Sequence, residues 1–183
     1  MKNFFNDKMP NSDEDLYSAF EQLEDVGDFP GDYRAKKEKV SREVFNLYIA
    51  YLAMSIWKGD GWGSVFAENH ALVPYLAEAM NAVGLSGISK AVEQTVSTFP
   101  VWTDFSDGET IYDIINFMEN PRRKIDNEVL LKISREEREQ MCSNYKDALH
   151  ELDELASPLW EHGAPQNEGL DIILEFVQKH WNQ

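Results

Sequence analysis

The sequence predicts an all-α protein that folds as a single compact domain over residues 1–183, with about seven or eight helices and a buried central helix. Apolar residues recur at helical spacing through most of the chain. Cap-forming residues precede these segments, and glycine or proline follows them. No stretch alternates apolar and polar residues for long enough to form a useful strand, and the nearest candidate, 101–105, is short.

The first segments lead to the central helix. Ser12, followed by an acid three residues later, resembles a capping box and predicts a helix over about 12–26. The longest apolar stretch, 44–57, carries apolar residues on all sides, so it predicts a helix that is buried nearly all round. We expect this helix to stop at the glycines of 59–61, and one or two helical turns to follow at 62–68.

Three further helices are bounded by their end signals. One begins at Asn69 or His70 and ends at Gly84, since glycine readily adopts the left-handed conformation that terminates helices. The other two cover about 86–98 and 109–119. A proline, which cannot continue a helix, follows each of them two residues later.

The last third of the chain gives the clearest helical pattern. Ser134 and Glu137 form a capping box for a helix that extends to about Ala156. One face of this helix carries Met141, Tyr145, Ala148, Leu149, Leu152 and Ala156. The stripe of a C-terminal helix consists of Leu170, Ile173, Leu174, Val177 and Trp181.

The overall charge excludes several classes of ligand. There are 33 acidic residues and 17 lysines and arginines, so the formal charge is −16. Such a field repels phosphate, and we expect neither direct nucleic-acid binding nor binding to an anionic membrane. The only cysteine, Cys142, cannot form an intramolecular disulfide, which fits a reducing compartment. The start has no apolar segment of signal-peptide length and 44–57 is short for a membrane span, so we expect a cytoplasmic protein.

The acidic residues are concentrated in three stretches. Residues 9–33 contain eight acids and no base, and residues 147–175 contain eight acids and neither Lys nor Arg. Residues 59–121 contain nine acids and one base, Lys90. Each stretch therefore has a net charge of −8, while the remainder of the chain is close to balanced.

A row of acids stands near the end of the helix that follows Ser134. Asp147, Glu151 and Glu154 are spaced i, i+4 and i+7, which places them in an arc of about 60°. Like charges at this spacing destabilise a helix slightly. The row is either a solvated face or a surface that binds a basic partner. The expected partner-binding surface consists of Asp147, Glu151 and Glu154, followed by Asp13, Glu14, Glu21 and Glu24.

We find no residue pattern typical of catalysis, of a metal site or of a cofactor. Cys142 and His150 are about 12 Å apart along one helix, too far for a thiolate–imidazole pair. The segment 150–154 begins like a zinc-protease helix, but Glu154 stands where the second histidine is needed. Cys142 is therefore expected in or near the core as a small apolar group.

A longer pattern resembles a known family. It consists of 61–69 (GWGSVFAEN), 77–84, 91–100 ending in Phe99-Pro100, 149–154 (LHELDE) and 172–180. Over about residues 40–183 the chain resembles the bacterial DNA-mimic protein family, whose domains are all-helical and many of whose members have no known function. The acidic segment at 12–26 lies outside this resemblance.

The resemblance implies an all-α fold and allows a homodimer. For the studied type it also implies an acidic surface that occupies the DNA-binding face of a regulator. Four residues receive structural roles from it. Gly61 and Gly63 would permit close approach of helices, Phe66 would lie in the core, and Asn69 would hold a helix end.

The leading hypothesis is a non-enzymatic acidic interaction protein, a DNA mimic whose carboxylates bind the basic face of a regulator or of another DNA-binding protein. A first alternative is an immunity- or antitoxin-type inhibitor that occupies the basic site of a nuclease or toxin. A second alternative, from another class, is an enzyme with a cleft near Asp60, Glu68 and His70. A deep cavity with a strongly perturbed titratable group would favour the enzyme.

Overall fold

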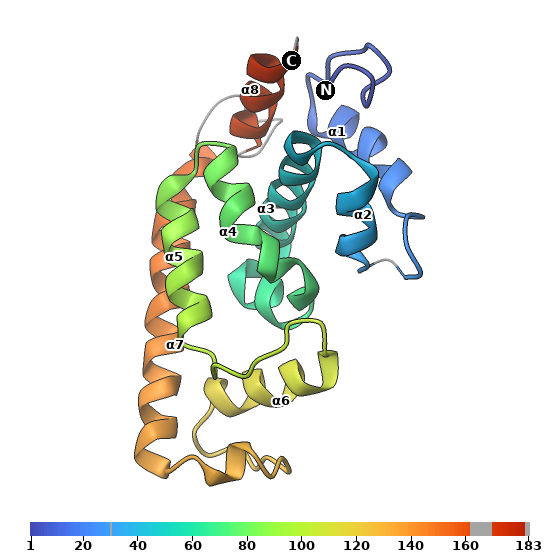
Figure 1. Ribbon diagram of the computed structural model, residues 1–183. Coiled ribbons are helices and arrows are strands. Elements are labelled where there is room, and N and C mark those ends of the chain that lie inside the picture. The colour runs from blue at the N-terminus through green and yellow to red at the C-terminus, as the bar shows by residue number, and fades with distance from the viewer. Residues whose placement is uncertain (30, 162–169, 182–183) are drawn as a thin grey trace.

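The computed structural model describes residues 1–29, 31–161 and 170–181, and all regular structure in these ranges is helical, which confirms the predicted all-α class (Figure 1). The α-helices are α1 (Asp13–Phe20), α2 (Tyr33–Lys39), α3 (Arg42–Ala67), α4 (Val73–Ala82), α5 (Ser86–Ser97), α6 (Gly108–Glu119), α7 (Arg135–Ala156) and α8 (Asp171–His180). The 3-10 turns are η1 (Glu21–Leu23), η2 (His70–Leu72), η3 (Leu130–Lys132) and η4 (Ser157–Glu161).

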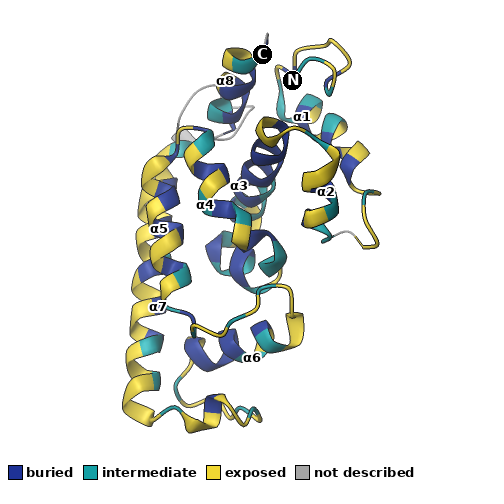
Figure 2. Ribbon diagram, viewed as in Figure 1, coloured by how far each residue is buried: buried dark blue, intermediate teal, exposed yellow. Residues whose placement is uncertain are grey.

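The helices pack around α3, which is the most buried of them (Figure 2). Helix α4 packs on α3, α5 packs on α4, and α7 packs on α5 and α6. In Figure 1, α7 runs along one edge of the molecule, whereas α1 and α2 lie beyond α3 on the other side. Most of the buried apolar residues form one continuous cluster. It joins the two ends of the chain, since the rings of Phe5 and Trp181 are 6.1 Å apart. None of the described helices has both the length and the apolar character of a membrane span.

The predicted stop at 59–61 is confirmed inside α3. Two helical segments meet there at Gly61, where φ is 79° and ψ is 171°, and the second segment is the short helix predicted to follow. Glycine reaches this φ without the steric cost that other residues pay. The close helix approach expected at Gly61 and Gly63 is wrong, because nothing lies within 4 Å of the place where a Cβ would stand at either residue. Gly61 instead supplies a backbone conformation.

The other residues of the family-like pattern have the surroundings of structural residues. Phe66 is fully buried in the core. The Asn69 side chain donates from Nδ2 to the carbonyl oxygen of Ser64 (3.4 Å), so it binds the end of α3 and does not cap η2. Gly84, with φ 92°, follows the end of α4 as predicted.

Two segments near the N-terminus differ from the prediction. The helix expected over 12–26 is divided, because α1 ends at Phe20 and η1 follows it. Helix α2 has no counterpart in the prediction, since its sequence is rich in bases and shows no apolar stripe. Its start is fixed by Asp32, whose side chain accepts from the Ala35 amide (3.0 Å), and its buried residues are Tyr33 and Lys36.

Candidate functional site

The acidic row, which we define as Asp147, Glu151 and Glu154, lies on the C-terminal half of α7. All three residues are exposed. The opposite face of the helix is buried, with Leu152 fully enclosed and Ala148 nearly so. The capping box between Ser134 and Glu137 is present and sets the register of the helix. Because α7 lies along the edge of the molecule, its outer face is open to a partner (Figure 2).

The acidic row has few polar contacts with the residues that the structure describes. Among the described residues, none of the three forms an ion pair, and the one polar side-chain contact is a long one from Ser143 to Asp147 (3.5 Å). The last turn of α7 contains no basic residue, although negative charge is unfavourable at a helix C-terminus. The row therefore opposes the helix dipole and its own members repel one another.

The N-terminal half of the same helix has the opposite arrangement. Glu136 and Glu137 lie in the first turn, where negative charge is favourable. Arg135 forms an ion pair with Glu139 (2.9 Å). Local helix physics therefore accounts for the charges at the start of α7 but not for those at its end.

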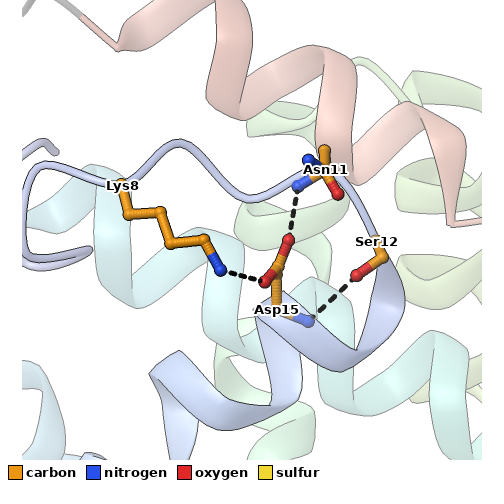
Figure 3. Close-up of polar contacts among 4 residues, drawn as sticks. All are labelled: Lys8, Asn11, Ser12 and Asp15. Carbon is orange, nitrogen blue, oxygen red and sulfur yellow. Dashed lines mark hydrogen bonds and ion pairs between the residues drawn. The ribbon is translucent and has the colours of Figure 1, made fainter.

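The acids expected at the N-terminus divide into internal and exposed groups. Asp13 accepts a hydrogen bond from the hydroxyl of Tyr51 (3.0 Å), so it joins α1 to α3. Figure 3 shows Asp15 bound by Lys8 (2.9 Å) and by the Asn11 amide (3.1 Å), and this pairing holds the pKa of Asp15 below its usual value. Of the four acids expected to bind a partner there, Glu14, Glu21 and Glu24 are exposed.

The structure separates the two groups of predicted site residues. Helix α7 and the α1–α2 region lie on opposite sides of α3 in Figure 1, so the acidic row does not form one face with Asp13, Glu14, Glu21 and Glu24. In the sequence the two groups look alike, because each lies in a stretch with a net charge of −8. In space they are two candidate sites.

A second candidate site surrounds Glu24. A cavity of about 670 Å³, which we name the aromatic groove, lies between the loop after η1, the middle of α3 and η2. It is lined by Glu24, Asp25, Phe29, Gly31, Tyr33, Tyr48, Leu52, Glu68, Asn69, His70, Ala71 and Ser106. Acids of the first and second acid-rich stretches therefore meet here. The sequence suggested a cleft near Glu68 and His70, but it gave no sign of the wall formed by 24–33, because no local pattern connects these distant segments.

Lys36 fixes the loop that forms one wall of the groove. Its side chain is fully buried, and Nζ donates to the carbonyl oxygens of Leu23, Glu24 (3.3 Å) and Val26 (3.0 Å). Burial lowers the pKa of the Lys36 ammonium, while the charges of nearby acids oppose that shift. One ammonium thus binds three carbonyls at and just after the end of η1 and holds the acidic loop in place.

The structure also locates the residues that were considered for chemistry. Among the described residues, no three His, Cys, Asp or Glu side chains gather as metal ligands. Cys142 is buried against the carbonyl of Phe117, and burial raises the pKa of its thiol. Of the expected cleft, Glu68 and His70 line the aromatic groove and Asp60 does not. The His70 ring is held by a contact from Nδ1 to the Phe105 carbonyl (2.6 Å).

Comparison with known proteins returns no match: no family model, no curated protein and no solved structure matches this chain. The resemblance to the DNA-mimic family therefore stays a prediction, and so does the homodimer that it allows.

Proposed function

We propose that this protein acts by binding a basic surface of a DNA-binding protein through the acidic row on α7. The observation that carries the proposal is the row itself: three exposed carboxylates, without ion pairs among the described residues, at a helix end that lacks any base. The arrangement costs the helix some stability. Binding to a basic partner would explain why the helix keeps these three charges despite the loss of stability.

The physical action is electrostatic. Carboxylates spaced by about 6 Å and about 4.5 Å along the axis present negative charge at intervals comparable with those of a DNA strand, where charges are about 3.4 Å apart. Lysines and arginines of a DNA-binding face would pair with them. The chain's overall charge of −16 would speed the encounter with such a partner and repel nucleic acid itself. We place this function in the cytoplasm, since the single cysteine has no partner for an intramolecular disulfide.

The test is competition with DNA. The tagged protein is used to capture basic proteins from a lysate, and bound proteins are then challenged with duplex DNA and with salt rising from about 50 mM to about 500 mM. The proposal expects both to release a DNA-binding protein. The matched bait carries Asp147→Asn, Glu151→Gln and Glu154→Gln, and should capture much less of it. Capture that resists salt and DNA, or that the triple variant retains, contradicts the proposal.

The inhibitor of a basic nuclease or toxin remains the nearest alternative hypothesis. It uses the same carboxylates and differs in the partner. Identification of the captured protein decides between them: a nuclease or toxin whose activity is blocked favours the alternative, and a regulator whose DNA binding is blocked favours the mimic.

A further inference from the structure

The aromatic groove combines negative charge with aromatic walls. Glu24 and Asp25 enter it from the loop after η1, and Glu68 enters it from the end of α3. Phe29, Tyr33 and Tyr48 supply three rings, and none of the described residues that line the cavity is a lysine or an arginine. Lys36 lies nearby, but it is fully buried and its ammonium is taken up by backbone carbonyls.

Two hydroxyls in the groove have no hydrogen-bond partner in the part of the chain that the structure describes. Tyr48 and Tyr33 are 5% and 9% exposed, yet neither phenolic oxygen forms a hydrogen bond with any described residue. Their rings are 6.4 Å apart and both line the cavity. Burial raises the pKa of Tyr48, and the nearby groups of Tyr33 and Glu24 raise it further. The body of each ring is buried, whereas its hydroxyl oxygen stays open to solvent. The two oxygens are therefore free to bind a group that enters the groove.

We propose that the aromatic groove receives an arginine side chain of a basic protein partner. This inference rests on the proposed function, which supplies the class of partner. The groove and the acidic row lie on opposite sides of α3, so the groove is a separate contact with its own recognition chemistry (Figure 1).

The groove chemistry suits a guanidinium better than an ammonium. A guanidinium is planar, stacks on aromatic faces and has five donors in a fixed fork. Three carboxylates and two phenolic oxygens offer acceptors for those donors. An ammonium is a compact and strongly hydrated charge that gains less from rings. The cavity of about 670 Å³ also has room for the residues that flank an arginine, since pockets of this size hold whole drug-sized ligands.

The test uses short blocked peptides and the full chain. Acetyl-Gly-Arg-Gly-amide is titrated into protein that carries ¹³C-labelled tyrosine. The lysine counterpart keeps the positive charge but lacks the planar guanidinium, and the citrulline counterpart keeps the planar group but is neutral. Methylguanidinium tests a free small molecule as the source. We expect the arginine peptide to shift the ring signals of Tyr33 and Tyr48 and to leave those of Tyr145 unchanged. The lysine peptide should bind at least about threefold more weakly, methylguanidinium more weakly than the arginine peptide, and the citrulline peptide not measurably.

Matched variants separate the groove from general acidity. Glu24→Gln with Glu68→Gln removes two charges from the groove, and Glu151→Gln with Glu154→Gln removes two from the acidic row. We expect the groove pair to weaken the arginine peptide at least about fivefold and the row pair to leave its affinity within about twofold. Tyr48→Phe keeps the ring, removes one hydroxyl and should weaken binding as well. Equal losses from both pairs, binding of the citrulline peptide, tighter binding of methylguanidinium, or unmoved Tyr33 and Tyr48 signals overturn the proposal.

The same variants distinguish this inference from the proposed function. If the arginine peptide does not bind but the acidic row still captures a DNA-binding protein, the groove proposal fails and the proposed function stands. If the groove pair removes capture while the row variant retains it, the role of the row fails and that of the groove stands.

Discussion

Neutralising the acidic row should make the protein more stable while it removes partner binding. The change is Asp147→Asn, Glu151→Gln and Glu154→Gln. It relieves one i,i+4 and one i,i+3 repulsion, each about 0.2–0.5 kcal/mol. It also removes an unfavourable charge from the last turn of α7, where no base is present, worth about 0.3–1 kcal/mol. We expect a gain of about 1 kcal/mol in the free energy of unfolding and a rise of about 2–4 °C in Tm.

The assay is thermal unfolding followed by circular dichroism, in low salt and again in about 1 M salt, where screening should remove most of the gain. Glu136→Gln is the matched control on the same helix. It deletes one negative charge from the first turn, where that charge is favourable, so it should lower stability by a few tenths of a kcal/mol. A triple variant that is less stable than the wild type in low salt, or a gain that salt does not change, refutes the reasoning.

Three further predictions test the fold that supports these sites. Lys36→Met leaves the carbonyls of the groove loop without their ammonium donor and should lower the free energy of unfolding by about 2 kcal/mol in urea titrations; an unchanged midpoint contradicts this. Gly61→Ala should cost about 1–2 kcal/mol because of its φ of 79°, whereas Gly63→Ala should be neutral or stabilising, and equal effects would contradict the assigned role. Burial raises the pKa of Tyr48 and Tyr145 above the ordinary value of about 10, so stability should hold below that pH and fall as pH rises beyond it; urea midpoints at about pH 8 and pH 11 check the sign.

The features that the sequence predicts well are those with local causes. The capping box at Ser134 and Glu137 acts within one helical turn, so the pattern alone locates the start of α7. The left-handed end at Gly84 is equally local. The break inside α3 is local as well, because Gly61 adopts a positive φ that regular helix geometry does not use.

The features that sequence reasoning missed depend on contacts between distant segments. In the sequence Lys36 is one base in a charged segment, but its ammonium binds three carbonyls ten to thirteen residues earlier and is buried there. The aromatic groove likewise joins the loop after η1 to α3, η2 and Ser106. The acidic row was visible because helical spacing alone puts its members on one side of α7. The sequence could not show that the acidic row is separate from the N-terminal acids, because that depends on where α7 and α1 lie relative to α3 (Figure 1).

The most direct test of the central claim is the salt dependence of the dissociation constant for the captured partner. It is measured for the wild type, for the acidic-row triple variant and for Glu136→Gln. The account predicts that wild-type binding weakens steeply as salt rises, that the triple variant binds weakly with a shallower dependence, and that Glu136→Gln follows the wild type. A triple variant with wild-type affinity and an unchanged salt slope would show that the carboxylates at the end of α7 are only a solvated face.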